Sequence, residues 1–306
     1  MNKYPLTPVT QAHIDTYKRD GVVLLEGMID QDWVERITDA WLRMRSEIEA
    51  GKPSYHIPQR MLDKDPRLAA ELDFMDGSEH RKDGSRTGFR SDKFMHFWDE
   101  DFMAYGTESP AGEMVGRVLE SKTVRYYWDQ LFVKDAGCDV PTYWHSDYPA
   151  WPCQGEMLPS LWLALTPIEK DVNSLEFIAG THRDTVTQWP RGFNSLNLEQ
   201  PADRPDFIDY EKHRGDPEVR FLSFDMNPGA AVLIHPRVYH GAGANNHPKQ
   251  DRIALTTRWF GDDIVWDPRP ECVNTPGLPF EEMTRGAHPD DDMLFPIAWR
   301  NESLAA

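Results

Sequence analysis

The first part of the chain shows a helical pattern, then a strand pattern, then a second helical pattern. Apolar residues recur at helical spacing over 11–19 after the capping residue Thr10, and Asp20-Gly21 predicts the end of that helix. The apolar run 22–25 predicts a short buried strand. Beyond it, a long amphipathic helix is expected to begin at Asp30 or Asp32.

The pattern then weakens. Residues 52–108 are polar and contain runs typical of loops at 76–78 and 82–85. Long irregular segments of this kind often form lids or binding loops, so we interpret 52–108 as a lid-like segment. A helix is expected over 110–119, with Pro110 near its start.

From residue 123 the pattern changes to short strands rich in aromatic and β-branched residues, each bounded by Gly, Pro, Asn or Asp. The expected strands are 124–133, 142–148, 160–165, 174–178, 219–224, 230–235 and 252–260. Several strands with uneven loops after a helical start favour a jelly-roll barrel or sandwich with helices packed outside. The Pro-rich, acidic segment 261–306 is expected to wrap the surface.

Composition narrows the class of partner. The chain has 306 residues, 33 Lys+Arg against 51 Asp+Glu, and a formal charge of −18, which disfavours nucleic acid and anionic membranes as partners. It has no apolar stretch of about 18 residues and no secretory h-region, so no membrane association is expected. The three cysteines, Cys138, Cys153 and Cys272, form no CxxC pair, which favours a reducing, cytoplasmic location.

One group of residues has the composition of a metal site. His145 and Asp147 lie in a predicted strand, where residues two apart point to the same face. His240, near a later strand end, can supply a third ligand. Two histidines and one carboxylate are the ligand set of non-haem Fe(II) oxygenases, and they leave positions open for a cosubstrate and O₂. The alternative is a surface histidine that bonds to a neighbouring carboxylate.

Arg252 opens the strand that follows His240. A guanidinium binds a carboxylate through two parallel hydrogen bonds, so beside a metal it suits the distal carboxylate of a 2-oxo acid. The alternative is a structural salt bridge with Asp251 or Asp225.

Taken in order, these motifs resemble the phytanoyl-CoA dioxygenase family of Fe(II)/2-oxoglutarate-dependent oxygenases, over roughly residues 8–262. The resemblance rests on seven segments in the order the family has them. They are Tyr17-Lys18-Arg19-Asp20-Gly21-Val22-Val23-Leu24-Leu25, Gln130-Leu131-Phe132-Val133-Lys134, Trp144-His145-Ser146-Asp147, Leu175-Glu176-Phe177-Ile178-Ala179-Gly180-Thr181-His182, Pro228-Gly229-Ala230, His240-Gly241-Ala242-Gly243-Ala244-Asn245-Asn246 and Arg252.

The resemblance implies the fold and the site. The fold would be a double-stranded β-helix, a cupin-like jelly roll with flanking N-terminal α-helices. The chain would then be a single oxygenase domain over 1–306, with a helical part (1–122), a jelly-roll core (123–260) and a C-terminal extension (261–306). Residues His145, Asp147 and His240 would bind Fe(II), and Arg252 would hold the 5-carboxylate of 2-oxoglutarate. Gln130 and Trp162 match positions that often help to seat that cosubstrate.

The implied reaction is hydroxylation of an unactivated C–H bond of a small molecule by O₂, with release of succinate and CO₂. Asp147 favours hydroxylation over halogenation, since halogenating members lack the carboxylate ligand. Ala242 replaces a hydroxyl residue that touches the cosubstrate in several members, and Ala179 replaces a proline. Two alternatives remain: a 2-oxoglutarate-independent metal enzyme on the same barrel, such as an oxygenase or isomerase, and a non-catalytic metal-binding sensor.

Aromatic residues are concentrated around the proposed ligand strands. They are Trp128, Tyr143, Tyr148, Trp151 and Trp162. They either fill the barrel core or line a pocket for an apolar or cationic substrate. The sequence predicts neither the substrate nor the oligomeric state.

Overall fold

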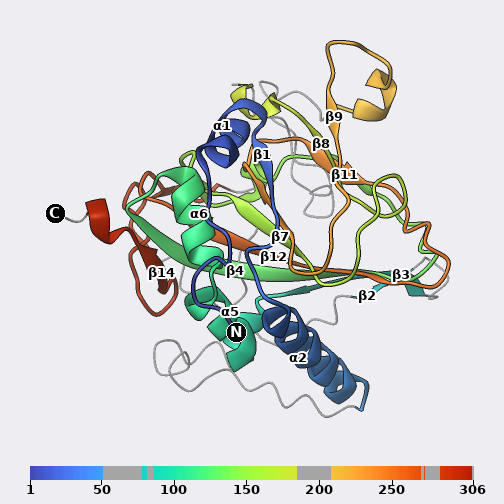
Figure 1. The fold of residues 1–306 in the computed structure, drawn as a ribbon, viewed down its shortest axis with the longest axis horizontal. Helices are drawn as coiled ribbons and strands as arrows, with labels where there is room; N and C mark the ends of the chain where they lie inside the picture. Colours follow the sequence, from blue (N-terminus) through green and yellow to red (C-terminus); the bar gives the residue numbers. More distant parts are fainter. Residues whose placement is uncertain (51–77, 81–85, 185–207, 270–271, 273–282, 305–306) are drawn as a thin grey trace.

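Two antiparallel sheets face each other in the computed structural model, which describes residues 1–50, 78–80, 86–184, 208–269, 272 and 283–304 (Figure 1). The large sheet has the order β1-β10-β7-β12-β4-β3-β2, with β14 also paired to β4, and the small sheet has the order β5-β11-β8-β9. Successive strands from β4 to β12 alternate between the two sheets, apart from the short β6 and the consecutive β8 and β9. This is the predicted jelly roll, so the mainly β fold class is confirmed.

The bounds of the elements are as follows. The large sheet contains β1 (Val22–Leu25), β2 (Ser78–His80), β3 (Arg86–Lys93), β4 (Thr123–Lys134), β7 (Ser160–Ala164), β10 (Ala231–Ile234), β12 (Arg252–Phe260) and β14 (Ile297–Arg300). The small sheet contains β5 (Thr142–His145), β8 (Glu176–Ile178), β9 (Phe221–Leu222) and β11 (His240–Ala242), and β6 (Cys153–Gln154) pairs with β13 (Val265–Trp266). The α-helices are α1 (Gln11–Asp20), α2 (Gln31–Glu49), α5 (Glu100–Glu108) and α6 (Ala111–Leu119). Short 3-10 helices are η1 (Met95–Phe97), η2 (Tyr148–Ala150), η3 (Thr181–Arg183), η5 (Tyr210–His213) and η7 (Glu302–Leu304).

The central strands of the large sheet are buried on both faces. Alternate residues of β7 and β12, such as Leu163 and Leu255, pack against the helices, whereas Trp162 and Ala254 pack between the sheets. Figure 1 shows α1, α2, α5 and α6 along one side of the large sheet and β8, β9 and β11 on the other. Because both faces are covered, β7 and β12 are buried over their whole length.

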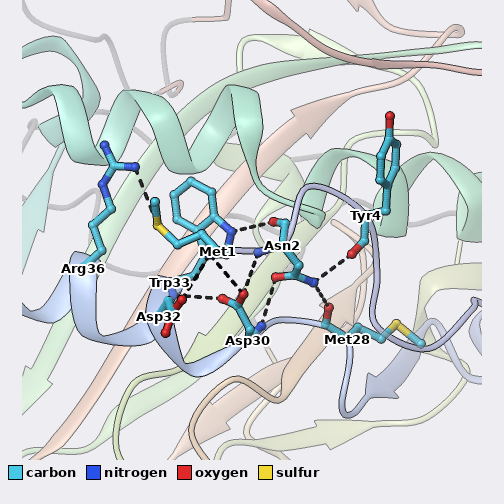
Figure 2. Close-up of polar contacts among 8 residues, drawn as sticks. All are labelled: Met1, Asn2, Tyr4, Met28, Asp30, Asp32, Trp33 and Arg36. Carbon is cyan, nitrogen blue, oxygen red and sulfur yellow. Dashed lines mark hydrogen bonds and ion pairs between the residues drawn. The ribbon is translucent and has the colours of Figure 1, made fainter.

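The N-terminal segment is attached to the start of α2. The side-chain amide of Asn2 donates to Met28 O at 2.7 Å, and Trp33 Nε1 donates to Asn2 O at 2.7 Å (Figure 2). Asp30 accepts from the backbone N–H of Trp33 at 3.1 Å, as a helix-capping residue does. Of the two possible starts for this helix, Asp30 is therefore the capping residue.

Gly21 ends α1 in the left-handed conformation, with φ of +74°, and its N–H donates to Tyr17 O at 2.7 Å. A Cβ atom here would lie 2.4 Å from Val238 Cγ2 and 2.5 Å from His182 Nδ1, which come from the segments around the small sheet. The glycine therefore lets α1 and β1 approach the barrel closely.

We expect Gly21→Ala to lower the free energy of unfolding by about 2–5 kcal/mol, combining left-handed strain with overpacking. Gly27 is the matched control, because its φ is +63° but nothing lies within 4 Å of its added Cβ. Gly27→Ala should cost only about 1–2 kcal/mol. Urea denaturation of both variants measures the difference, and equal losses would contradict the role of close packing at Gly21.

Two expectations from the sequence need correction. Residues 86–108 are not irregular: they form β3, η1 and α5, because Phe102 and Tyr105 insert into the core beneath the large sheet. The rest of the expected lid, 52–77 and 81–85, lies outside the described residues. The C-terminal part also does more than wrap the surface, since β14 pairs with β4 and Phe295 is fully buried. No helix in the described part of the chain is long and apolar enough to cross a membrane.

Candidate metal centre

The pairing of β5 with β11 places His145 directly opposite His240, with ring centroids 4.2 Å apart. The Nδ1 atom of His145 lies 2.7 Å from Tyr143 O, and that of His240 lies 3.0 Å from Val238 O. A carbonyl oxygen only accepts hydrogen bonds, so both Nδ1 atoms carry the proton and both Nε2 lone pairs are free to bind a metal.

Asp147 reaches the same point by a different route from the one the sequence suggested. Strand β5 ends at His145, and Asp147 has helical backbone angles (φ −74°, ψ −31°) at the start of η2. The alternation of side chains along a strand therefore does not explain its position, and that expectation is wrong. The turn into η2 brings Asp147 Oδ1 to 3.7 Å from His145 Nε2 and 3.9 Å from His240 Nε2.

The three side chains form one donor set, since their ligand atoms all lie within 4.8 Å of one another. Burial alone would raise the pKa of Asp147, but the charges of His240, Arg258 and His145 and a hydrogen bond from Ser160 bring it below the ordinary value. Burial, reinforced by His145, lowers the pKa of His240 to about 4. A carboxylate beside two imidazoles whose Nε2 atoms are directed at the same point is the donor set of non-haem iron sites.

Ser160 orients the carboxylate. Its Oγ donates to Asp147 Oδ2 at 2.9 Å, which leaves Oδ1 directed at the two Nε2 atoms. We expect Ser160→Ala to weaken metal binding about 10- to 100-fold, because hydrogen bonds to metal ligands contribute on that scale. Ser174→Ala is the control, because the Ser174 hydroxyl bonds to Leu175 O and Phe224 O and not to a residue of the donor set. Competitive titration with a metal-sensitive dye measures both, and unchanged affinity in Ser160→Ala would refute the orienting role.

The inner face of the large sheet continues the site in rows that run across three strands. Thr256 of β12 lies between Trp162 of β7 and Gln130 of β4. In the same way, Arg258 lies between Ser160 and Trp128. Because alternate residues share a face, Arg252 points to the same interior at the start of β12.

Arg252 has the properties expected of an anion-binding group. It is only 2% exposed, its Nη1 donates to Asn173 O at 3.3 Å, and its Nε is buried without a partner. Burial lowers its pKa to about 10, so it stays charged at neutral pH. The alternative of a structural salt bridge is wrong: Asp251 accepts from Ala136 N and Asp225 from Lys170 N.

The other two predicted cosubstrate contacts lie on the correct face. Trp162 is 3% exposed in the core between the sheets, and Gln130 is 8% exposed. Gln130 is already engaged, since its Oε1 accepts from Arg258 Nη2 at 2.8 Å and its Nε2 donates to Ser91 Oγ. Their contact with a cosubstrate stays a prediction.

Two residues of the site were not predicted from the sequence. Arg258 lies opposite Ser160 on the inner face of β12. Its even spacing from Arg252 along the same strand was the signal that could have indicated it. Asn245 is fully buried, and its Nδ2 lies 2.9–3.0 Å from Lys134 O, Asp135 O and Gln250 O. It thereby holds the loop that leads from His240 to Arg252.

The aromatic residues around the ligand strands have different surroundings. Trp128 and Trp151 lie 4.2 Å and 5.3 Å from the Arg258 guanidinium, measured from ring centroids. Tyr148 instead stacks on Arg237 at 3.6 Å, and Tyr143 is 57% exposed. Only part of the aromatic group therefore surrounds the interior.

Comparison with known proteins decides the family. The model of the phytanoyl-CoA dioxygenase (PhyH) family matches residues 17–254, which include the candidate metal ligands and Arg252. The chain belongs to the phytanoyl-CoA dioxygenase family. A curated relative, the dioxygenase FrzG of Cladobotryum sp, is 25% identical over 260 residues, which cover 83% of this chain and 76% of FrzG.

Several solved structures share this fold. The non-haem α-ketoglutarate-dependent carbocyclase SnoK from nogalamycin biosynthesis is 14% identical, with a TM-score of 0.64, covering 98% of this chain and all of SnoK. EctD from S. alaskensis with bound Fe is 16% identical, with a TM-score of 0.62, covering 90% of this chain and 87% of EctD. EctD has also been solved with 2-oxoglutarate and 5-hydroxyectoine. Family and donor set together support the expected cofactors, iron and 2-oxoglutarate.

Proposed function

We propose that this protein is an Fe(II)/2-oxoglutarate-dependent dioxygenase that oxidises a C–H bond of a small organic molecule. The observation that carries the proposal is the donor set: His145 and His240 have their Nδ1 protons held by carbonyls, and Asp147 has one oxygen held by Ser160. All three free ligand atoms converge on one point, and three ligands on one face leave coordination positions open.

The chain's residues then have separate roles. His145, Asp147 and His240 bind the metal, and Arg252 binds the distal carboxylate of 2-oxoglutarate with its unpartnered Nε–H and its Nη groups. The barrel walls around Trp162 exclude water. When bound, iron and 2-oxoglutarate supply the O₂ activation that the protein's own side chains cannot perform.

Thr256 adds a polar group to the inner face between the metal ligands and Arg252. Its Oγ1 is buried without a partner, and it lies in the row that joins Trp162 and Gln130. In place of the hydroxyl missing at Ala242, it offers a donor on the inner face for an oxygen of the cosubstrate.

Hydroxylation is the favoured outcome, since Asp147 occupies the carboxylate position that halogenating members lack. Proteins of similar fold include a carbocyclase as well as EctD, which was solved with 5-hydroxyectoine, so ring closure is the outcome to compare with hydroxylation.

The test is succinate formation. Purified protein incubated with Fe(II), O₂ and 2-oxoglutarate should form succinate slowly without a substrate and faster with one. Mass spectrometry of the oxidised substrate then distinguishes hydroxylation, a gain of 16 mass units, from ring closure, a loss of 2. Absence of 2-oxoglutarate consumption across a broad panel of organic compounds would favour the sensor alternative.

A further inference from the structure

A second arginine lies on the inner face of β12, next to the metal centre. Arg258 is directly opposite Ser160, whose hydroxyl donates to the metal-binding carboxylate of Asp147. On its other side, Arg258 faces Trp128 of β4. The side chain is only 3% exposed, so a positive charge is buried in the wall beside the metal centre.

The hydrogen bonding of Arg258 is incomplete. Nη2 donates to Gln130 Oε1 at 2.8 Å and Nη1 to Thr256 O at 3.2 Å, both neutral acceptors, while Nε is buried without a partner. The indole Nε1 atoms of Trp128 and Trp151 are likewise buried without partners. The interior thus contains three N–H donors without partners, on Arg258, Trp128 and Trp151. Buried donors are normally hydrogen-bonded, so this group favours a ligand that supplies acceptor oxygens.

Arg258 also lacks a dedicated counter-charge. Among the described residues no carboxylate forms an ion pair with it, and the two acids whose charges act on it are Asp147 and Asp129. Asp129 accepts from the backbone N–H groups of Met95 and His96, from His96 Nδ1 and from Tyr126 OH, on the helix-facing side of β4. A bound divalent cation would neutralise the negative charge of Asp147. The positive charge of the buried Arg258 guanidinium would then have no counter-charge among the described residues.

A β-bulge shapes this end of the site. Trp128 and Tyr126 pair with consecutive residues of β12, Arg258 and Trp259, so Tyr127 is an extra residue on β4. Tyr127 therefore joins Trp128 in the cluster around Trp151, and its ring stacks on Phe260 at 4.3 Å. The result is an aromatic wall around a cation, which suits a ligand with one anionic end and an apolar body.

We propose that Arg258, framed by Trp128 and Trp151, binds a carboxylate of the organic substrate, which is therefore an apolar or aromatic organic acid. A planar carboxylate can accept from the unpartnered Nε–H of Arg258 and from the adjacent Nη group, beside the two indole rings. This inference rests on the proposed function, because it assigns Arg252 to the cosubstrate and so leaves Arg258 for the substrate.

The experiment uses the full chain loaded with Zn(II) and N-oxalylglycine, a 2-oxoglutarate analogue that does not turn over. Matched pairs of probes, benzoate with benzamide and 3-phenylpropanoate with 3-phenylpropanamide, are titrated by calorimetry and by tryptophan fluorescence. We expect at least one acid to bind at least about tenfold more tightly than its amide, since a charge-assisted hydrogen bond replaces a neutral one. Arg258→Gln should remove that preference while the variant still binds N-oxalylglycine, and Arg258→Lys should keep part of the preference.

Arg237→Gln is the matched control, because Arg237 stacks on Tyr148 but pairs with Glu156. It should leave the preference for acids intact. Equal binding of acids and amides by the wild-type protein would overturn the proposal without any variant. So would loss of N-oxalylglycine binding in Arg258→Gln together with its retention in Arg252→Gln, since Arg258 would then be the cosubstrate anchor. Failure of wild-type protein to bind N-oxalylglycine at all would instead refute the proposed function.

Discussion

Replacing Asp147 with alanine is expected to reduce 2-oxoglutarate-dependent succinate formation to below about one-thousandth of the wild-type rate. Removing even an outer hydrogen-bond partner of a metal ligand costs 10- to 100-fold, and removing the ligand itself costs more. Asp147 is the one carboxylate of the donor set. The measurement is coupled turnover at saturating Fe(II), together with metal content after dialysis.

Asp225→Ala is the control for that variant. Asp225 is exposed and accepts a hydrogen bond from the backbone N–H of Lys170, outside the donor set. It should retain full turnover and metal content. Circular dichroism of both variants establishes that they are folded, and coupled turnover that persists in folded Asp147→Ala would refute the assignment of the site.

The second large effect is expected at Arg252. Arg252→Gln should raise the KM for 2-oxoglutarate about 30-fold or more, because truncating one partner of a buried charge pair costs about 2–5 kcal/mol. The guanidinium is 2% exposed, and no carboxylate in the described ranges forms an ion pair with it, so the distal carboxylate of the cosubstrate would be its counter-charge. Steady-state kinetics with varied 2-oxoglutarate measure the change.

An anchor role and a purely structural role of Arg252 predict different results. If Arg252 binds 2-oxoglutarate, Fe(II) affinity and the unfolding midpoint should change little in Arg252→Gln. Arg252→Lys should then recover part of the 2-oxoglutarate affinity, because it keeps the charge. If the KM for 2-oxoglutarate stays at the wild-type value while stability falls, Arg252 is a core residue and not the anchor.

Periodicity in the sequence was sufficient for the strands that form the barrel. The predicted strands 124–133 and 252–260 match β4 and β12, because both strands are long and largely buried, although β1, β3 and β14 extend the large sheet beyond the predicted limits of 123 and 260. It failed for 86–108, whose charged residues conceal a strand, β3, that pairs through its backbone with β4. Backbone pairing leaves no strong pattern of side chains.

The metal site was also predicted in part. The three ligands follow from residue types and order, but the position of Asp147 depends on the turn into η2 and not on strand alternation. Arg258 shares the inner face of its strand with Arg252, so the alternation of side chains could have indicated it, but its contacts with Trp128 and Trp151 join separate segments of the chain and have no sequence signal. The bulge at Tyr127, which turns two successive aromatic residues to one side, has no signature in the sequence.

The most direct test of the central claim is an anaerobic titration of the Fe(II)-loaded protein with 2-oxoglutarate, followed by visible absorption. Fe(II) in complex with a 2-oxo acid would give a metal-to-ligand charge-transfer band in the visible range. The account predicts a band that saturates at one equivalent of 2-oxoglutarate in the wild-type protein and is lost in Asp147→Ala. A wild-type protein that binds Fe(II) but develops no band, or an Asp147→Ala variant with the same band, would contradict it.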